Sequence, residues 1–405
     1  MWEQIRSNQW RSLVLSITMG LTLVGLGYAL GLYFADNGLA GILFAIAFWI
    51  IMILLAFFQG DNILLTLSKA RKIGPDDHPR LYNIVEEMRI ASGLAKMPDV
   101  YIIDDPAMNA FAIGRNQNKA AVAVTAGLLS KLNRDELQGV IAHEMAHIKN
   151  RDVLLMAFTS VLLGTIVMLS WYASRMMIFG GGSNSRRNSG GNPGQVIILI
   201  IALLLVVLAP IFAQLIYFAI SRKREYLADA SGALYTRYPE GLASALEKIS
   251  GSTEQLKSAN QATAPMYITN PFRKKGKAAE NLSSTHPPIS ERIRILRSMS
   301  GTSFADYNAA YTEVHGGKGG ILPASALAAT PKASMKQTSK KMAAVPTDNT
   351  TELQRTRETS DLLWKMNDYS TIDCQCGTRL RVPPGYKNSS VQCPHCGAMN
   401  KVKKG

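Results

Sequence analysis

Charged side chains are scarce in this sequence, and long apolar runs take their place. Of the 405 residues, 18% are Asp, Glu, Lys or Arg, whereas 47% are hydrophobic. A soluble protein of this length carries more charge, so the composition argues against a wholly soluble chain and favours membrane segments. The length allows about two or three domains.

Cysteine is also scarce and is confined to the C-terminal end, so no disulfide can form before residue 374. The four cysteines make two close pairs with 16 residues between them, and a glycine follows each pair. This spacing is typical of a zinc ribbon, with a structural zinc held by Cys374, Cys376, Cys393 and Cys396. The first pair has one intervening residue instead of two, which makes His395 a reserve ligand. Disulfides are the alternative, and the cytoplasmic location inferred below argues against them.

The sequence lacks a basic stripe interleaved with aromatic residues, although its formal net charge is +15. Its Lys and Arg residues flank the apolar runs and fill residues 301–361 instead. A nucleic-acid-binding surface gathers such residues on one face. Anionic lipid head groups are therefore the simpler partner, and nucleic acid is not expected.

Four long apolar runs are present, at residues 12–34, 38–58, 153 to about 171, and 196–220. The first two have the length of about twenty residues that a helix needs to cross a bilayer. A cleaved signal peptide is the alternative for the first, but the run is too long for one and a second run follows at once. The last two would form a hairpin, joined by a flexible Gly- and Ser-rich loop. Because this loop region contains Arg175, Arg186 and Arg187, a hairpin lying only partly in the membrane is the alternative.

Basic residues at the ends of the first two runs predict which side of the membrane the chain faces. Arg6 and Arg11 precede the first run, and Lys69, Arg71 and Lys72 follow the second. Such residues favour the cytoplasmic side, so residues 59–152 are expected in the cytoplasm. Within them, residues 81–91 have a helical pattern, and residues 99–104 and 120–125 have the pattern of short strands. A small mixed sheet is expected there.

Residues 140–152 contain the pattern H-E-x-x-H as His143, Glu144 and His147. On a helix the two histidines lie one turn apart on the same face, so both can reach one Zn²⁺ ion. Glu144 is rotated off that face, where its carboxylate can take a proton from water activated by the metal. This is the chemistry of peptide hydrolysis. The bare pattern also occurs in helices whose histidines are ordinary polar residues. The apolar spacing around it, and a helix start with an acidic first turn at Asn133-Arg134-Asp135-Glu136, indicate a partly buried helix.

The hairpin predicts a third ligand. Few residues separate His147 from the third apolar run, or the fourth run from Glu225, so an antiparallel hairpin would place both within roughly 10 Å of the span ends. Glu225 would complete a His₂Glu site with an open fourth position. Asp229, one turn further on, is expected to accept a hydrogen bond from a liganding imidazole. The alternative is that both carboxylates pair with the neighbouring basic residues Arg222, Lys223 and Arg224.

Four motifs together resemble the HtpX-type membrane zinc metalloproteases, which are relatives of the CAAX prenyl proteases. They are HEMAH, the later EYLAD, NAFAIG at 109–114 and STHPPISERI at 284–293, and the resemblance covers roughly residues 1–300. It implies a bacterial inner-membrane endopeptidase that cleaves damaged or misassembled membrane proteins at the cytoplasmic face. The zinc ligands would be His143, His147 and Glu225, the general base Glu144, and a supporting group Asp229.

The resemblance also places the STHPP region near the active site. His286 is therefore a candidate to stabilise the oxyanion of the tetrahedral intermediate. The alternative is that HPP is only a turn before a helix at 290–298. Arg292 is expected to be solvated, as arginines early in helices usually are. The strand at 120–125 is expected either to offer an edge to an extended substrate or to be buried on both faces.

The expected fold is a mainly α membrane protein: four apolar helices with a cytoplasmic α+β zincin-like protease domain, plus a small C-terminal zinc ribbon. Residues 1–58 would form two transmembrane helices, and residues 59–300 the protease domain, which contains the membrane hairpin at 153–220. Residues 301–361 have few large apolar side chains and predict a flexible linker, followed by the ribbon at 362–405. The expected cofactors are one catalytic and one structural zinc ion, and the expected partners are polypeptide substrates and the bilayer. A non-catalytic membrane scaffold and a zinc sensor, either recruiting partners through the ribbon, are the alternatives.

Overall fold

The computed structural model describes most of the chain outside the second apolar pair. Its continuous described segments are residues 2–35, 37–114, 116–153, 222–257, 286–317, 319–322, 324–328, 351–386 and 388–402. Isolated described residues are 166–167, 170–171, 175, 211 and 267–268. The expected hairpin at 153–220 therefore lies almost wholly outside the described residues.

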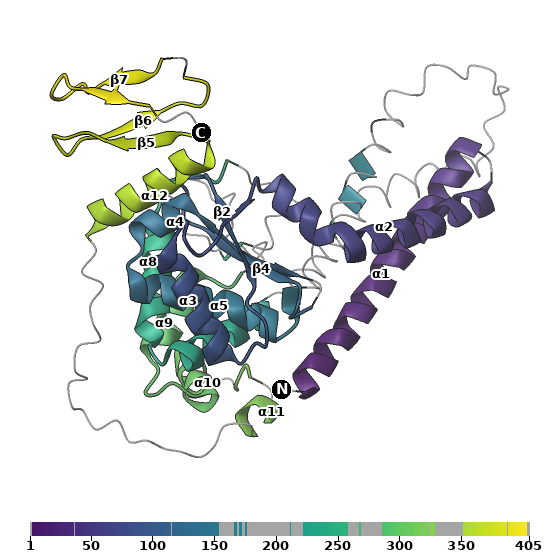
Figure 1. The fold of residues 1–405 in the computed structure, drawn as a ribbon. Coiled ribbons are helices and arrows are strands. Elements are labelled where there is room, and N and C mark those ends of the chain that lie inside the picture. The colour runs from purple at the N-terminus through teal and green to yellow at the C-terminus, as the bar shows by residue number, and fades with distance from the viewer. Residues whose placement is uncertain are drawn as a thin grey trace.

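Two long helices, α1 (Trp2–Ala35) and α2 (Gly38–Leu67), form an antiparallel pair that projects from the body of the molecule (Figure 1). They cross closely because glycines face one another: a Cβ atom on Gly41 would lie 2.1 Å from the carbonyl oxygen of Gly27. In α2, Gly38–Leu55 is long and apolar enough to cross a membrane, whereas the apolar part of α1, Gly20–Leu32, is shorter. Among the described residues, α2 is the one helix that meets this test, where four spans were expected.

A four-stranded mixed sheet forms the first layer of the body. Its strands are β1 (Arg71–Lys72), β2 (Asp99–Ile103), β3 (Ala110–Gly114) and β4 (Ala120–Thr125), in the order β1-β2-β4-β3. β4 pairs in parallel with β2 and antiparallel with β3, and all six of its residues are buried. Of the two alternatives for residues 120–125, the structure shows the strand buried on both faces and not the open edge, because both of its backbone edges are already paired. β3 is the edge strand on that side.

Helices pack against this sheet and against one another to form one hydrophobic core. They are α3 (Pro79–Ser92), α4 (Ala126–Lys131), α5 (Arg134–Lys149), a helix at residues 222–236, α8 (Pro239–Gly251) and α9 (Ile289–Arg297). α5 contacts the sheet through β3 and β4 and is flanked by α3 and α8. The helix that carries the H-E-x-x-H pattern therefore runs through the centre of the body.

α5 begins where the sequence predicts. The side chain of Asn133 accepts a hydrogen bond from the Glu136 backbone N–H, and the Asn133 N–H donates to the Glu136 carboxylate, both at 2.9 Å. This reciprocal capping fixes the start of the helix. Glu136 also accepts hydrogen bonds from Ser244 and Lys248 on α8. The cap therefore also anchors α5 to its neighbour.

In the stretch 301–361, which was expected to be a flexible linker, α10 (Phe304–Val314) and α11 (Ala324–Ala328) lie inside and α12 (Glu352–Met366) crosses the end at 361. α10 buries Phe304, Tyr307 and Ala310, and α12 buries Leu362. The short helix α11 lies between them. These segments are too poor in large apolar residues to fold alone, but their few apolar side chains complete a core that the rest of the body supplies.

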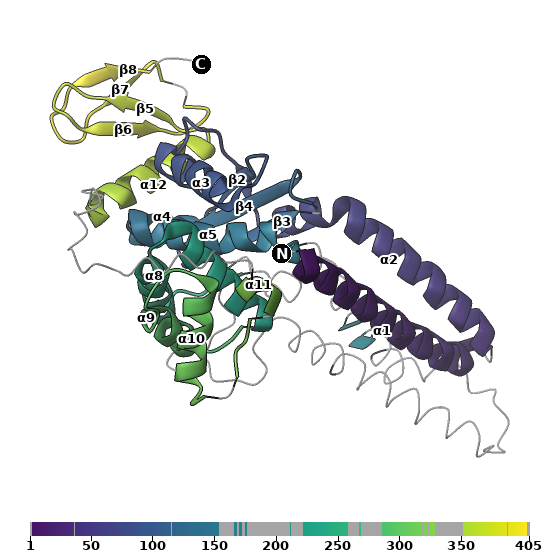
Figure 2. The same cartoon turned by 90° about the horizontal axis from the view of Figure 1, so that it is seen from below.

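The C-terminal end consists of two β hairpins. β5 (Ser370–Asp373) pairs with β6 (Arg379–Val382), and β7 (Ser390–Gln392) pairs with β8 (Met399–Lys401). β6 is held against α12 because Asp361 accepts hydrogen bonds from Arg379 and Arg381 at 2.7 and 2.8 Å. In both views the hairpins lie at the end of the body away from the α1–α2 pair (Figures 1 and 2).

Candidate metal centre

The two histidines of the H-E-x-x-H pattern face each other from successive turns of α5. Their Nε2 atoms lie 3.2 Å apart, and the side chains of His143 and His147 are 0% and 5% exposed. The sequence predicted a partly buried helix at this point. Its middle is in fact fully buried, because the sheet, α3 and α8 surround it.

The helix at 222–236 brings Glu225 to the same point. The Glu225 Oε2 atom lies 3.6 Å from His143 Nε2, and its Oε1 atom lies 3.5 Å from His147 Nε2. The two helices approach closely, since a Cβ atom on Gly232 would lie 3.3 Å from the His143 backbone nitrogen. One ligand atom from each of the three residues lies within 4.8 Å of the others.

These distances fit a zinc ion. Four ligands at about 2.1 Å in a tetrahedron lie about 3.4 Å from one another, close to the 3.2, 3.5 and 3.6 Å separations among the three residues. The donor set of two imidazoles and a carboxylate is one that zinc prefers. Within the described part of the chain, the buried Glu225 Oε2 atom accepts no hydrogen bond, although Arg292 Nη1 lies 3.3 Å and His286 Nε2 3.7 Å away. Buried carboxylate oxygens rarely stay unsatisfied, so a cation at this point would satisfy it.

The opposite nitrogen of each imidazole faces a buried carboxylate. His143 Nδ1 lies 3.0 Å from Asp229 Oδ1, and His147 Nδ1 lies 3.3 Å from Asp152 Oδ2. An Nδ1–H donated to each carboxylate leaves the Nε2 lone pairs free to converge on a metal. Asp229 lies where the sequence placed it.

Asp152 was not predicted as a site residue, although it lies only five positions after His147. α5 ends at Lys149, and Arg151 has a left-handed backbone with φ of 60°. This residue turns the chain back so that Asp152 meets the imidazole. The spacing of the motif gives no signal for such a reversal at a residue that is neither Gly nor Asn.

Arg292 on α9 is fully buried, so the expectation that it is solvated is wrong. It donates two hydrogen bonds to Asp229, and its Nη1 atom lies 3.3 Å from Glu225 Oε2. The cause is the pair of buried carboxylates on the facing helix, which require a counter-charge. His286 lies at the same place, with Nε2 3.7 Å from Glu225 Oε2 and 4% exposure.

The electrostatics of the site favour a positive charge between the ligands. Burial alone would lower the pKa of His143, but its contacts with the carboxylates of Asp229 and Glu225 raise it to about 9. Burial would raise the pKa of Asp229, but the charge of Arg292 and the hydrogen bond to His143 hold it below its usual value. Burial lowers the pKa of His286 to about 4, so its ring is neutral at pH 7.

Glu144 lies beside the ligands on α5 with 1% exposure. Burial raises the pKa of its carboxyl group, opposed mainly by the charges of His143 and His147. A carboxylate that is less acidic than usual is a better proton acceptor.

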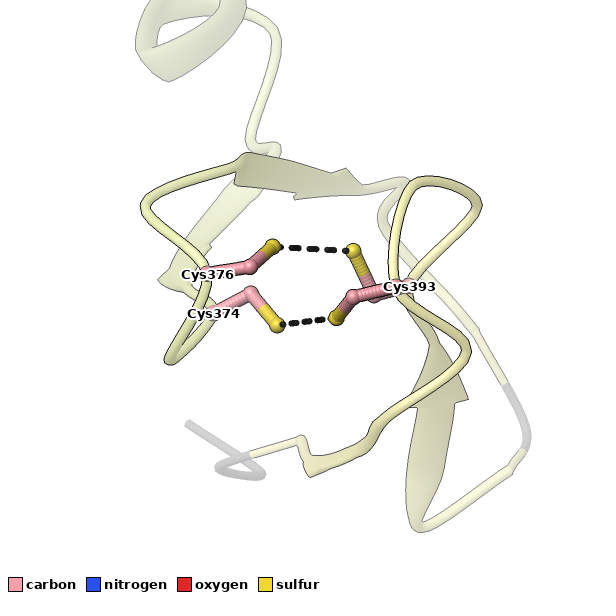
Figure 3. Close-up of side chains that lie close together, drawn as sticks. Cys374, Cys376 and Cys393 are labelled. Atoms are coloured by element: carbon pink, nitrogen blue, oxygen red, sulfur yellow. Dashed lines mark hydrogen bonds between the residues drawn. The ribbon is translucent and has the colours of Figure 1, made fainter.

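The four cysteines come together at the tips of the two C-terminal hairpins (Figure 3). The Sγ atoms of Cys374 and Cys396 lie 3.5 Å apart, those of Cys376 and Cys393 lie 3.7 Å apart, and all four lie within 4.8 Å of one another. Sulfur ligands at about 2.3 Å from a tetrahedral zinc lie about 3.8 Å apart, so this group also fits. The single residue between the first two cysteines does not prevent convergence. His395, the reserve ligand, is not in this group.

The sequence is similar to a known protein family and to individual known proteins. The sequence pattern of peptidase family M48 matches residues 75–300. A protein named Protease HtpX homolog from Streptococcus pneumoniae (strain Hungary19A-6) is 42% identical over 301 residues, covering 74% of this chain and 100% of the relative. One of the same name from Caldanaerobacter subterraneus subsp. tengcongensis is 44% identical over 300 residues, covering 74% of this chain and 98% of the relative.

Among solved structures, the crystal structure of S. mikatae Ste24p is similar at 20% identity and a TM-score of 0.40, covering 73% of this chain and 67% of that one. The family match ends at residue 300. α10, α11, α12 and the cysteine hairpins therefore lie outside it.

Proposed function

The chain belongs to peptidase family M48 and is a metalloprotease, and on this premise we propose that His143, His147 and Glu225 hold one catalytic zinc ion while Glu144 acts as the general base. The observation that supports this most directly is the convergence of the three ligand atoms within 4.8 Å of one another. Glu225 follows His147 by 78 positions in sequence, yet it meets both histidines at one buried point.

Glu144 and His286 would have separate roles in the hydrolysis of a peptide bond. A bound zinc ion would polarise the scissile carbonyl and lower the pKa of water. Glu144 would take the proton from the attacking water and pass it to the leaving amine. His286, neutral and buried beside Glu225, would donate a hydrogen bond to the oxyanion. No covalent intermediate with the protein is needed.

Arg292 and Asp229 would hold the ligands in place. Asp229 fixes the ring of His143 through Nδ1, and Arg292 fixes Asp229 through its two hydrogen bonds. Such partners set the tautomer and orientation of a metal-binding histidine. In this proposal neither residue touches the substrate.

We also propose where the protein lies in the cell and which proteins it cleaves. The relatives are proteases named HtpX homologs, and α2 is long and apolar enough to cross a membrane. We propose a multi-pass protein of the bacterial inner membrane, with residues 153–220 as a second membrane hairpin and the active site at the cytoplasmic face. Its substrates would be damaged or misassembled membrane proteins. The body would extend beyond residue 300 to include α10, followed by a docked ribbon that binds a structural zinc ion.

Activity and metal content of variants test the mechanism. The full chain, purified in detergent, should cleave casein, and a chelator should stop the cleavage. Glu144→Gln should abolish cleavage while zinc content stays at the wild-type level, because the ligands remain. Glu225→Ala should lower both. Full activity of the Glu144→Gln variant would refute the base, and a zinc-loaded wild type that cleaves no polypeptide would favour a scaffold or a sensor.

A further inference from the structure

We infer that Asp152 is a positioning residue for His147, and that its ion pair with Arg224 links this ligand to the segment that carries Glu225. The inference rests on the proposed metal site and adds to it a residue from outside the helices that bear the ligands. It concerns how the site is held together.

The contact with His147 is direct and buried. Asp152 is 0% exposed, and its Oδ2 atom lies 3.3 Å from His147 Nδ1. A carboxylate can only accept a hydrogen bond there, so it favours the ring tautomer that carries its hydrogen on Nδ1. The Nε2 lone pair is then available on the side where Glu225 Oε1 lies, 3.5 Å away. This repeats the arrangement of Asp229 with His143 on the other ring.

The backbone after α5 is shaped to bring Asp152 to this position. The helix closes with a hydrogen bond from Asn150 N–H to the Ala146 carbonyl, and Arg151 N–H donates to the Ile148 carbonyl. Arg151 then adopts a φ of 60°. A left-handed backbone is unfavourable for a residue with a side chain. The turn that delivers Asp152 is therefore maintained against a local cost, which the buried contacts of Asp152 offset.

The second carboxylate oxygen of Asp152 faces the helix that carries Glu225. Asp152 Oδ1 lies 3.7 Å from Arg224 Nε, and Arg224 is 4% exposed. Arg224 immediately precedes Glu225 in the chain. One carboxylate therefore contacts a ligand on α5 with one oxygen and the neighbour of the third ligand with the other. Residues 153–223, which contain the expected membrane hairpin at 153–220, connect these two points.

The alternative is that Asp152 only balances the charge of Arg224 and does not orient the ring of His147. The two roles differ in what a conservative change does. Asp152→Asn keeps the size and an acceptor oxygen but removes the charge that fixes the tautomer. Asp152→Glu keeps the negative charge on a side chain that is one methylene longer. A positioning role predicts a loss of metal affinity in the folded protein, which a structural role does not.

Zinc affinity of the full chain in detergent, measured by competition with a chelator, tests the inference. Asp152→Asn should weaken zinc binding at this site by about 10- to 100-fold, as removal of such partners does. Asp152→Asn also leaves the buried Arg224 without its counter-charge, so the metal-free variant should unfold at a lower temperature than the wild type, and zinc affinity is compared well below that temperature. Asp152→Glu, which keeps the charge, should restore part of the affinity. Asp99→Asn is the matched control, because Asp99 forms an exposed ion pair with Lys72 and should bind zinc as the wild type does.

Arg224→Gln tests the link without altering Asp152. It should weaken zinc binding in the same direction, and the double variant should lose less than the sum of the two single losses, because the two residues contact each other. His147→Ala separates this inference from the proposed metal site. If His147→Ala loses one zinc ion while Asp152→Asn and Arg224→Gln keep wild-type affinity, the inference is wrong and the metal site stands. If His147→Ala also keeps all its zinc, the proposed site itself fails.

Discussion

Arg292 on α9 donates two hydrogen bonds to Asp229, one of 2.8 Å from Nε to Oδ2 and one of 2.7 Å from Nη2 to Oδ1. Both residues are 0% exposed. The pair lies directly behind His143, whose Nδ1 is 3.0 Å from the same Asp229 Oδ1. A charge pair this deeply buried is costly to break, because the remaining partner keeps its charge without compensation.

Replacing this arginine should therefore affect both stability and the metal site. Arg292→Met leaves Asp229 and Glu225 without their buried counter-charge and should cost about 3–5 kcal/mol. In a body of this size that corresponds to a fall in melting temperature of roughly 10 °C, measurable by thermal unfolding in detergent. Zinc affinity should fall as well, because Asp229 no longer holds the ring of His143 in one orientation.

A second arginine on the same helix provides the control. Arg297 pairs with Glu240 and Glu247 at the surface, where its side chain is 40% exposed. Solvent screens such pairs, so Arg297→Met should change the melting temperature far less and leave zinc affinity unchanged. Equal effects of the two substitutions would show that the buried pair has no special role.

The lowered pKa of His78 predicts how the stability of the folded protein depends on pH. Burial, with a contribution from the charge of Arg80, lowers its pKa to about 4, and its Nδ1 atom accepts a hydrogen bond from the Leu81 N–H at the start of α3. The unfolded chain, with a pKa of about 6.5, takes up a proton that the folded chain refuses. This group therefore costs no stability above pH 6.5. Stability falls as the pH drops from about 6.5 to about 4, by an upper limit of roughly 3 kcal/mol.

His78→Asn should remove this dependence while keeping the cap, since Asn is a good acceptor at a helix start. Melting temperatures of the wild type and the variant, taken at half-unit steps between pH 7 and pH 4, give the difference directly. The wild type should lose more stability than the variant over this interval. Parallel curves would mean that His78 is protonated as easily in the folded as in the unfolded chain.

Gly139 lets α5 and α8 pack backbone against backbone. A Cβ atom there would lie 2.6 Å from the Leu242 nitrogen, nearer than real contacts allow. Gly139→Ala should therefore push the helices apart and cost about 1–3 kcal/mol. Because α5 carries both histidines, zinc affinity should fall with stability. Gly251→Ala is the control, since a Cβ atom there meets nothing within 4 Å, and its melting temperature should match or exceed that of the wild type.

The parts of the candidate site that depend on local spacing could be predicted from the sequence. The histidine pair follows from the period of a helix, the start of α5 from Asn133 and Glu136, and the four cysteines from their short spacings. The approach of Glu225 to the histidines was inferred from the two apolar runs that separate them. Each of these depends on neighbours in sequence or on one simple hairpin.

The remaining features depend on partners far away in sequence. Arg292 is buried because Asp229, 63 residues earlier, needs a counter-charge. Asp152 reaches His147 because Arg151 takes a backbone conformation that few residues of its kind adopt. α12 forms on a surface provided by α4, where Leu362 joins the core of the body. No local pattern in residues 301–361 carries this information.

Because α12 packs on the body, we expect the cysteine hairpins that follow it to remain attached to the body even when the chain before α12 is cut. Leu362 is 3% exposed in the core, and Lys365 Nζ lies 2.6 Å from Asp77 Oδ1 on the body. If a specific cleavage sequence is inserted between residues 328 and 351 and the purified protein is cut there, the C-terminal fragment should stay bound to the body. It should co-elute with the body in gel filtration.

Leu362→Ala should release that fragment. Truncating a buried leucine costs about 2–5 kcal/mol, which is a large part of what a single docked helix can contribute. Leu353→Ala on the same helix is the matched control, because Leu353 is 60% exposed and its loss should leave the fragment bound. Release of the wild-type fragment after cutting would show instead that the hairpins are only tethered. Retention in the Leu362→Ala variant would place the binding energy in the polar contacts of Asp77 and Arg71 with the end of α12.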